Sequence, residues 1–259
     1  MDEKTVLVTF DREMRRDARP DGPGARVERT GGVVRQVGAD GHGWSAVLWS
    51  DLTEDTADRA IAEQVEYFAS LKREFEWKHY AHDRPGDLGE RLAAAGLVAE
   101  PPESLMVADA RDLPTDVVLP DGVELRAVTD EAGVDLMADV HERVFGTDVT
   151  RLRNAVLTRL AEDPDSIAAV VAMDGDEPVC SARIEFNQGT RFAGLWGGGT
   201  LPRWRGRGIY RALIAHRARL AAERGYRYLQ VDASDESAPI LHRLGFARLS
   251  VTTPYVYQP

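Results

Sequence analysis

The sequence predicts a mixed α/β fold built from two similar halves. Three consecutive apolar runs separated by turn residues indicate neighbouring strands at 166–173, 178–186 and 191–201. A glycine-rich turn follows, and apolar residues at helical spacing then run over 209–224. A short helical run, a glycine and an apolar residue occur twice, as LGERLAAAGLVAE at 88–100 and as PILHRLGFARL at 239–249. This repetition indicates two halves in tandem.

The composition is typical of a soluble globular protein. Of the 259 residues, 43% are hydrophobic and 29% are charged, and no apolar run approaches the ~18 residues that span a bilayer. The first residues carry charges where a signal peptide has its apolar centre, and the single cysteine, Cys180, permits no internal disulfide. We therefore expect a cytoplasmic protein without a membrane partner. The net charge of −11 disfavours a nucleic-acid partner, because phosphate contacts need clustered cations.

The first hundred residues contain no motif that carries chemistry. Gly41-His42-Gly43 indicates a turn, and His79 and His82 lie three residues apart without a cysteine partner. Such a pair is more typical of structural histidines than of metal ligands, so no metal is expected. The predicted elements of this half are short strands at 5–10, 33–37 and 44–49, a helix over 57–75, a short run at 76–80 and a helix at 87–95.

The two halves are joined by a proline-rich connection. Residues 100–122 contain four prolines and end in Asp121-Gly122, as a linker between domains does. The second half then begins with a strand at 123–128, a helix that Asp130 caps, and a helix at 151–161. The predicted domains are therefore a first domain at 1–110, a linker at 111–122 and a second domain at 123–259.

The turn before the helix at 209–224 has the properties of a phosphate site. A helix that begins directly after a turn leaves several backbone N–H groups without an intrahelical partner, at the positive end of its dipole. Gly206 and Gly208 allow positive φ and let a ligand approach the backbone. Arg203, Arg205 and Arg207 add local positive charge to an acidic chain. This combination predicts a site for a pyrophosphate group.

The run Arg203-x-x-Gly206-x-Gly208 after an apolar strand resembles the R/Q-x-x-G-x-G/A signature of the GNAT superfamily of N-acetyltransferases. The segment ASDESAPILHRLGF at 233–246 resembles the second motif of that family, N-x-x-A-x-x-L-Y-x-x-x-G-F. The resemblance covers about 121–257 and implies the GNAT fold, with a reduced GNAT-like first half that lacks the phosphate site. It implies acetyl-CoA as acyl donor, bound by Gly199, Thr200, Leu201, Arg203, Arg205, Gly206, Arg207, Gly208, Ile209, Tyr210 and Ser234.

The resemblance also implies where acyl transfer takes place. In this family the pantetheine arm lies along the strand expected at 191–201, as an added strand would. Backbone N–H groups near Trp196–Gly198 are then placed to stabilise an oxyanion. The loop between the first two helices of the second half lines the acceptor site. Candidates there are Glu142, Asp148 and Arg151, of which Asp148 is preferred, together with Trp196; a solvated polar face is the alternative for each of the three polar residues.

Glu185 is the candidate for the base that accepts the proton of the amine. It is the only carboxylate within the apolar runs of the three strands, so partial burial is expected to raise its pKa. An outward-facing glutamate is the alternative, because Arg183 and Glu185 share one face of the strand.

The candidate for the general acid departs from the family pattern. Leu241 stands where the family has tyrosine, and leucine cannot donate a proton. Three alternatives remain open at this point. His242 serves instead, or Tyr210, Tyr255 or Tyr257 reaches the site from elsewhere, or the thiolate leaves without a dedicated acid.

The sequence thus predicts an N-acetyltransferase that moves an acetyl group directly from acetyl-CoA to a primary amine of a small molecule or peptide. The protein is expected to be a monomer or homodimer. Direct transfer requires no protein nucleophile, so Cys180 is expected to be a buried apolar residue. Two alternatives remain. One is a non-catalytic acyl-CoA-binding or regulatory module, which the missing tyrosine supports, and the other is an interaction protein without CoA affinity.

Overall fold

The computed structural model describes residues 1–40 and 43–259 and contains two compact units. The predicted turn residues Gly41 and His42 lie outside the described part. Each unit combines segments from separate parts of the sequence, so the units do not test the predicted domains at 1–110 and 123–259 with a linker at 111–122. That division remains a prediction. Unit 1 consists of Met1–Met106, Asp232–His242 and Ala247–Pro259, and unit 2 consists of Val107–Val231 and Arg243–Phe246.

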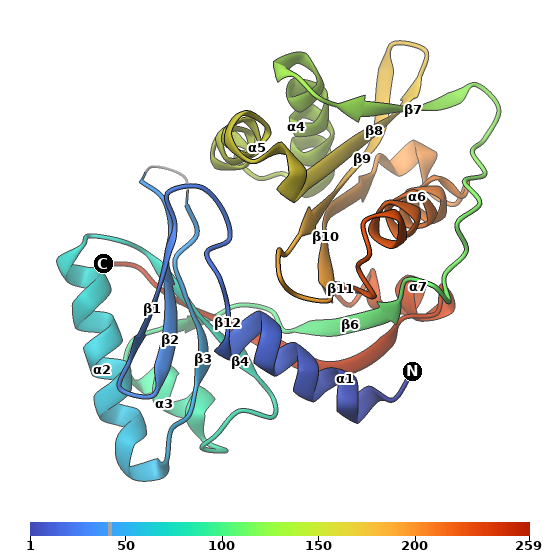
Figure 1. Ribbon diagram of the computed structural model, residues 1–259. Coiled ribbons are helices and arrows are strands. Elements are labelled where there is room, and N and C mark those ends of the chain that lie inside the picture. The colour runs from blue at the N-terminus through green and yellow to red at the C-terminus, as the bar shows by residue number, and fades with distance from the viewer. Residues whose placement is uncertain (41–42) are drawn as a thin grey trace. The chain divides into compact units, whose positions relative to one another are not determined.

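Unit 1 contains a mixed sheet with the strand order β1-β2-β3-β4-β12 (Figure 1). Within it, β3 and β4 are parallel and the other neighbours are antiparallel; β5 also pairs with β12. The elements that lie in this unit or begin in it are α1 (Glu3–Phe10) with a π-helical turn (Asp11–Arg16), β1 (Arg26–Thr30), β2 (Val33–Val37), β3 (Ala46–Ser50), α2 (Glu54–Ser70), β4 (Phe75–Tyr80), α3 (Leu88–Ala94), β5 (Val98–Ala99), β6 (Glu103–Asp109), α7 (Ala238–Arg243) and β12 (Ala247–Tyr257).

Two predictions for the first half differ from the structure: one element is of the wrong type, and one helix is present but ends earlier than expected. Residues 5–10 form part of helix α1 and not a strand, because Val6, Thr9 and Phe10 are buried at a helical spacing of three and four residues. The helix expected to reach residue 75 ends at Ser70, where Lys72 adopts a φ of 51°. Phe75 then begins β4, and its ring stacks on that of Phe68 at 4.4 Å.

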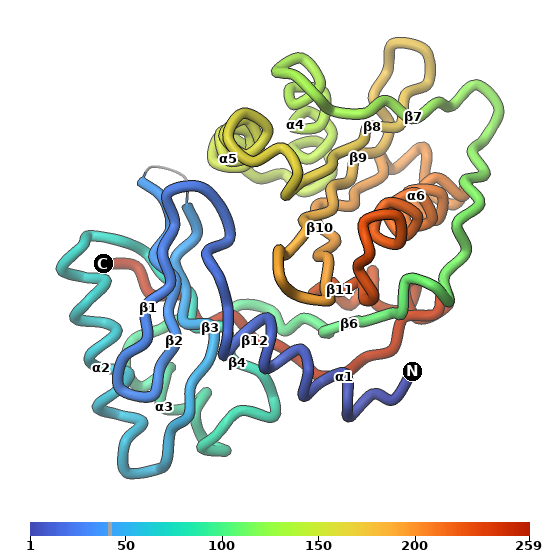
Figure 2. Tube along the Cα trace, in the orientation of Figure 1, coloured from blue at the N-terminus to red at the C-terminus, as the bar shows by residue number. Residues whose placement is uncertain are grey.

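The end of the chain completes the sheet of unit 1. Residues Thr252–Tyr257 of β12 pair with Tyr80–Phe75 of β4, so the red C-terminal strand runs beside segments from the first hundred residues (Figure 2). The core on this sheet is built by the apolar faces of α2 and α3. Tyr255 packs against that core, and a Cβ placed on Gly89 would lie 2.5 Å from the Tyr255 hydroxyl oxygen. Gly89 is therefore required for β12 to pack as it does.

Unit 2 contains a sheet with the order β11-β10-β9-β8-β7, in which only the β10–β11 pair is parallel. Helices α4 and α5 lie on one face of this sheet and α6 lies on the other (Figure 1). The elements of unit 2 are β7 (Val123–Val128), α4 (Glu131–Phe145), α5 (Thr150–Glu162), a 3-10 turn (Pro164–Ser166), β8 (Ile167–Asp174), β9 (Glu177–Phe186), β10 (Phe192–Thr200), a 3-10 turn (Pro202–Trp204), α6 (Ile209–Glu223) and β11 (Tyr228–Ala233), whose last two residues belong to unit 1.

The elements predicted for the second half are confirmed. The three strands expected at 166–173, 178–186 and 191–201 are β8, β9 and β10, and the helix expected over 209–224 is α6. The Asp130 side chain accepts a hydrogen bond from the Gly133 N–H at 2.8 Å, as a helix cap should. Among the described residues, no helix combines the length and the apolar character needed to cross a membrane.

Candidate functional site

Strands β10 and β11 part after three residue pairs. Phe192, Ala193 and Gly194 pair with Tyr228, Leu229 and Gln230, and the described residues show no further pairs between these strands. Beyond Gly194, β10 stays paired with β9 as far as Thr200. One edge of β10 therefore has no strand partner from β11 over 195–200. A backbone edge of this kind can accept an extended ligand.

The glycines of β10 form a bulge that other side chains approach closely. The register of β10 with β9 shifts between Trp196 and Gly199, and Gly197 has a φ of 57°. A Cβ on Gly197 would lie 3.0 Å from Nη1 of Arg183, and a Cβ on Gly198 would lie 3.0 Å from Cε2 of Tyr210. At both positions only glycine fits without a shift of these neighbours.

The turn before α6 is open on its outer side. Gly206 and Gly208 have φ values of 74° and 87°, which glycine adopts without strain. Apart from the glycine and its two neighbours in the chain, no described residue has an atom within 4 Å of a Cβ placed on either residue. Gly208 is the N-cap of the 15-residue helix α6, whose first residue, Ile209, is buried. The first backbone N–H groups of α6, which have no partner within the helix, therefore lie at this open turn.

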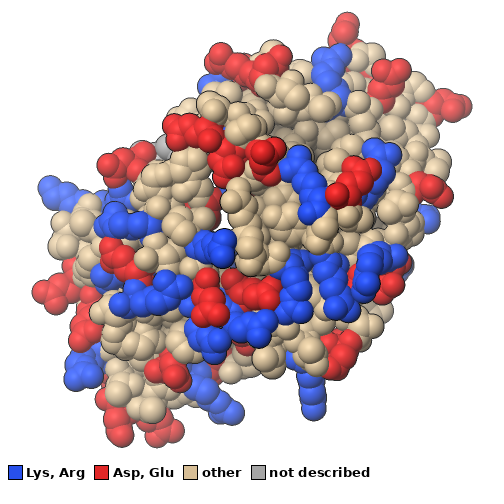
Figure 3. All heavy atoms as spheres, viewed as in Figure 1, with Lys and Arg blue, Asp and Glu red and all other residues tan. Residues whose placement is uncertain are grey.

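The three arginines of the turn are exposed, and each also contacts the protein. Arg203 forms an ion pair with Glu177, and Arg205 Nε donates to the carbonyl of Thr200 at 3.1 Å. The guanidinium of Arg207 lies 4.6 Å from the ring centre of Trp204. On the face shown in Figure 3, Lys and Arg side chains lie among Asp and Glu side chains. Positive charge at the turn is therefore local, and Glu177 offsets part of it.

Glu185 is half-buried between two arginines and does not have the predicted raised pKa. Its carboxylate lies 2.7 Å from Nη1 of Arg159 on α5 and 2.9 Å from Nε of Arg183. Burial alone would raise the pKa of Glu185, but the charges and hydrogen bonds of Arg183 and Arg159 outweigh burial and lower it. The expectation of a raised pKa is wrong, because the sequence did not show that α5 supplies Arg159. A carboxylate held in this way is a poor proton acceptor.

His141 on α4 reaches the bulge, and the sequence reasoning missed it. Its Nδ1 would lie 3.6 Å from a Cβ on Gly197, and its ring packs against Phe145 at 4.5 Å. Burial and the charge of Arg183 lower the pKa of His141, so the ring is neutral at neutral pH. The available signal was a histidine near the end of α4. His141 lies four residues before Phe145, the last residue of that helix, and so shares a helix face with it.

Arg217 on α6 approaches the bulge from the opposite face. Only 2% of its surface is exposed, and a Cβ on Gly198 would lie 3.6 Å from its Nη2. Nε donates to the carbonyl of Leu213 at 3.1 Å and Nη1 donates to the carbonyl of Arg183 at 3.2 Å. Nη2 has no hydrogen-bond partner in the described structure. Burial lowers the pKa of the Arg217 guanidinium.

The remaining predicted site residues are dispersed. Asp148 is exposed and accepts hydrogen bonds from the N–H and hydroxyl of Thr150, so its carboxylate caps the start of α5. Trp196 lies in the bulge with 37% of its surface exposed. Ser234, His242 and Tyr255 belong to unit 1, and Leu241 is fully buried. The three predicted catalytic residues, Glu185, His242 and Tyr255, are therefore not gathered within one unit. Cys180 is buried as expected.

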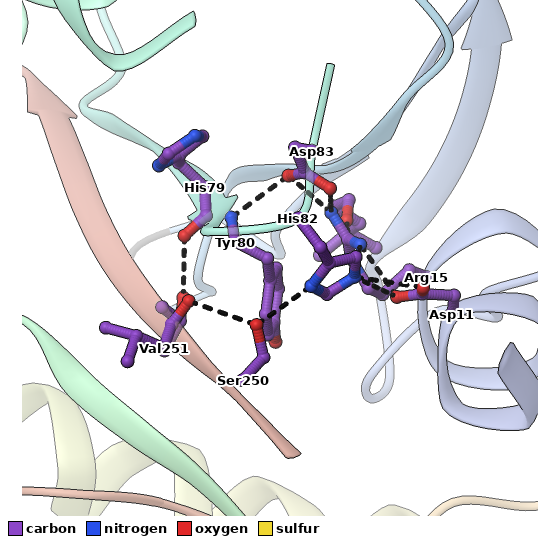
Figure 4. A network of polar contacts seen from close by, with 10 residues as sticks. Asp11, Arg15, His79, Tyr80, His82, Asp83, Ser250 and Val251 are labelled. Atoms are coloured by element: carbon purple, nitrogen blue, oxygen red, sulfur yellow. Dashed lines mark hydrogen bonds and ion pairs between the residues drawn. The ribbon is translucent and has the colours of Figure 1, made fainter. Parts of the chain in front are cut away.

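A second polar cluster lies in unit 1 around Arg15 (Figure 4). Arg15 Nη2 donates to both carboxylate oxygens of Asp83 at 2.7 and 2.8 Å, and Nη1 donates to Asp11 at 2.8 Å. His82 joins the cluster through contacts with Asp11 at 3.0 Å and with the Ser250 hydroxyl at 2.8 Å. These contacts connect the N-terminal helical segment to β12 and to the turn after β4. His82 therefore has a structural role, as the sequence predicted.

The geometry of unit 2 agrees with a comparison against known protein families. Residues 134–246 match the Acetyltransferase (GNAT) family. This part of the chain is a GNAT acetyltransferase domain. The match contains the bulge, the open turn and α6, and it ends at the second predicted GNAT motif. No curated protein matches the chain.

Solved structures resemble this chain over nearly its whole length. A GCN5-related N-acetyltransferase from Kribbella flavida has a TM-score of 0.69 and 18% identity, covering 99% of this chain and 94% of its own. A conserved protein of unknown function from Staphylococcus epidermidis has a TM-score of 0.68 and 16% identity, covering 94% and 96%. A tandem GNAT protein from the clavulanic acid biosynthesis pathway has a TM-score of 0.58 and 13% identity, covering 99% and 94%. Such identities establish the fold alone, and the predicted tandem GNAT fold is confirmed.

Proposed function

We propose that this protein transfers an acetyl group from acetyl-CoA to a primary amine of a small-molecule or peptide acceptor. The open turn before α6 carries the proposal. Gly206 and Gly208 there hold left-handed backbone with free space where a side chain would stand, at the start of a helix. Open glycines with positive φ also follow helices, as at Gly225, but Gly206 and Gly208 precede a helix start, where free N–H groups and the positive end of the helix dipole favour a pyrophosphate. The GNAT domain at 134–246 supports the same reaction class.

The edge of β10 fits the remainder of the donor. After Gly194 the strand has no further pairs with β11, and the buried Oε1 of Gln230 beside this point has no partner. An amide-containing arm would find backbone groups along β10 and an acceptor oxygen at Gln230. Bound acetyl-CoA would supply an acetyl thioester. Thr200, Leu201 and the turn from Arg203 to Tyr210 would hold the phosphate end.

The residues around the bulge then take complementary roles. Backbone N–H groups of Trp196–Gly198 would donate to an oxygen that gains negative charge. His141 replaces Glu185 as our candidate proton acceptor, because it is neutral, adjacent to Gly197 and not paired with a cation. Of the alternatives for the general acid, we favour departure of the CoA thiolate without a proton donor. Leu241 is buried and Tyr255 packs against the core of unit 1.

Calorimetric titration with acetyl-CoA tests the donor site. Gly208→Ala places a methyl group in the open space and should weaken binding at least about tenfold, which corresponds to about 1.4 kcal/mol. Gly225→Ala at the other end of α6 is the matched control, because Gly225 has a φ of 80° and the same free space. Both variants carry the same backbone strain. Equal affinities for the two variants would contradict the proposed donor site.

A free-thiol assay with a panel of amines tests transfer itself. Release of CoA that depends on an amine supports the enzyme. His141→Gln should lower the rate of transfer more than it lowers acetyl-CoA affinity. Binding of acetyl-CoA without transfer to any amine would instead support the non-catalytic acyl-CoA-binding module.

A further inference from the structure

Arg217 carries a positive charge that the folded protein does not neutralise. Its guanidinium is buried, and the two groups to which it donates are the uncharged carbonyls of Leu213 and Arg183. In the described part of the chain no carboxylate is paired with it. The titratable groups nearest to it are Tyr210, Cys180 and Arg183, and none of these supplies a negative charge at neutral pH. Arg183 is itself paired with Glu185.

A buried cation without a counterion is unfavourable unless something else provides the negative charge. The free donor of Arg217 is Nη2, which lies beside Gly198 in the bulge. Tyr210 approaches the same glycine, with its Cε2 3.0 Å from a Cβ placed on Gly198. A ligand group that extends along the edge of β10 to Gly198 would therefore come close to both Nη2 and the ring of Tyr210.

The pyrophosphate expected at the open turn is not this counterion. Arg217 lies nine residues after Gly208 on α6, about 13.5 Å along the axis at a rise of about 1.5 Å per residue. Its Nη2 lies beside Gly198 in the bulge and not within 4 Å of a Cβ placed on Gly208. A second anionic group is needed, close to the bulge where the acyl group is expected. A carboxylate matches a guanidinium in charge and in hydrogen-bond geometry.

We propose that Arg217 binds a substrate carboxylate at the bulge of β10. This inference rests on the proposed function and narrows its substrate class. The carboxylate has two possible sources. It is either the distal carboxylate of a dicarboxylic acyl group on the donor, as in succinyl-CoA, or the carboxylate of an amino-acid acceptor. A plain acetyl donor with a simple amine leaves Nη2 without its partner.

The donor source is tested by calorimetry with acetyl-CoA and succinyl-CoA. We expect the parent protein to bind succinyl-CoA at least tenfold more tightly than acetyl-CoA. Arg217→Met should reduce this preference to near unity, and Arg217→Lys should keep part of it. Arg219→Met is the control on the same helix, because Arg219 is exposed and its polar contacts with described residues are those with His216 and Glu223. This variant should keep the preference.

The acceptor source is tested by thermal shift with saturating acetyl-CoA. A panel of L-amino acids is compared with the corresponding amides, which differ only in the carboxylate. If the acceptor supplies the anion, an amino acid will stabilise the parent protein and its amide will not. Arg217→Met should lose that difference and Arg219→Met should keep it.

The outcomes separate this inference from the proposed function. No binding of acetyl-CoA to the folded parent contradicts the proposed function. Tight acetyl-CoA binding with neither carboxylate preference overturns the inference on Arg217 and leaves the proposed function intact. A preference that survives in Arg217→Met and in Arg217→Lys also overturns it, because the carboxylate is then bound elsewhere.

Discussion

Arg15 in unit 1 and Arg217 in unit 2 are equally buried, with 3% and 2% of their surfaces exposed. Arg15 donates to two carboxylates and to the carbonyl of Leu48, and it lies 4.1 Å from the ring centre of Tyr80. Arg217 donates to two carbonyls and has a free Nη2. Burial lowers the pKa of both, but the charges of Asp83, Tyr80 and Asp11 reverse this for Arg15 and raise its pKa.

The difference distinguishes a residue that holds the fold together from one that is available to a ligand. Arg15 finds its counterions within unit 1, so its charge is used in folding. Arg217 lacks a counterion and lies at the bulge of the GNAT domain. A buried charged group that lacks a counterion and has a free hydrogen-bond donor is a candidate for binding a ligand. The following variants test this comparison.

Arg15→Met should cause the largest change. The substitution leaves Asp83 and Asp11 without their cation, and Asp83 is 95% buried at its side chain, so the free energy of unfolding should fall by about 3–5 kcal/mol. Urea denaturation followed by circular dichroism measures the loss. Arg12→Met is the control, because the Arg12–Glu13 pair is exposed at the arginine and should contribute less than about 1 kcal/mol. Similar losses in the two variants would mean that Arg15 is not the anchor of this cluster.

Glu103 is an exception within unit 1 and should make stability depend on pH. Burial, and then the charges of Asp232, Glu76 and Glu100 against that of Lys78, raise the pKa of Glu103 to about 7. The folded protein therefore binds this proton more tightly than the unfolded chain does. Stability from this group is present at low pH and is lost as pH rises from about 4.5 to 7.

For a half-buried carboxyl we expect this effect to be about 1–2 kcal/mol after screening by solvent is allowed for. Unfolding free energies of the parent protein and of Glu103→Gln, measured at pH 5 and pH 8, isolate the contribution. The parent should lose more stability than the variant over this interval. Parallel changes in both proteins would assign the raised pKa to another group.

Ser250→Ala should have a smaller effect. The variant removes the hydroxyl that contacts His82 at 2.8 Å, and His82 keeps its contact with Asp11. A single hydrogen bond of this kind contributes about 0.5–1.5 kcal/mol. Thermal unfolding of Ser250→Ala and of the exposed Ser234→Ala measures the difference. A loss as large as that of Arg15→Met would show that the cluster depends on β12 as much as on its arginine.

Arg217→Met should have the smallest effect on stability when no ligand is present. Replacing an uncompensated buried charge by an apolar side chain of similar length should leave the free energy of unfolding within about 1 kcal/mol of the parent, or raise it. Urea denaturation of the ligand-free protein provides the measurement. A loss of the size expected for Arg15→Met would contradict the comparison, because the Arg217 charge would then already be compensated.

The parts of the fold that the sequence predicts correctly are those that depend on residues close together in the chain. The strands at 166–201, the bulge glycines and the turn before α6 follow from short-range periodicity and from residues with special backbone conformations. Residues 5–10 were misassigned because a short apolar run fits a strand as well as a helix. Arg217 was missed because an arginine in a helix is expected to be exposed, although it lies four residues after Leu213 and four before Ala221, both buried. The partner of Glu185, Arg159, comes from α5 and could not be read from strand alternation.

The position of β12 has a consequence for how the chain is made on the ribosome. Its six pairs with β4 join residues that are separated by more than 170 positions. At roughly 5–20 residues per second, translation of the 140 residues 107–246 takes about 7–28 seconds, and during this time β4 lacks that neighbour. The order of synthesis therefore lets unit 2 fold before unit 1 is complete. A stop codon shortly before β12 would remove a strand from a sheet in which β1, β2, β3 and β4 lie more than 160 residues earlier in the chain.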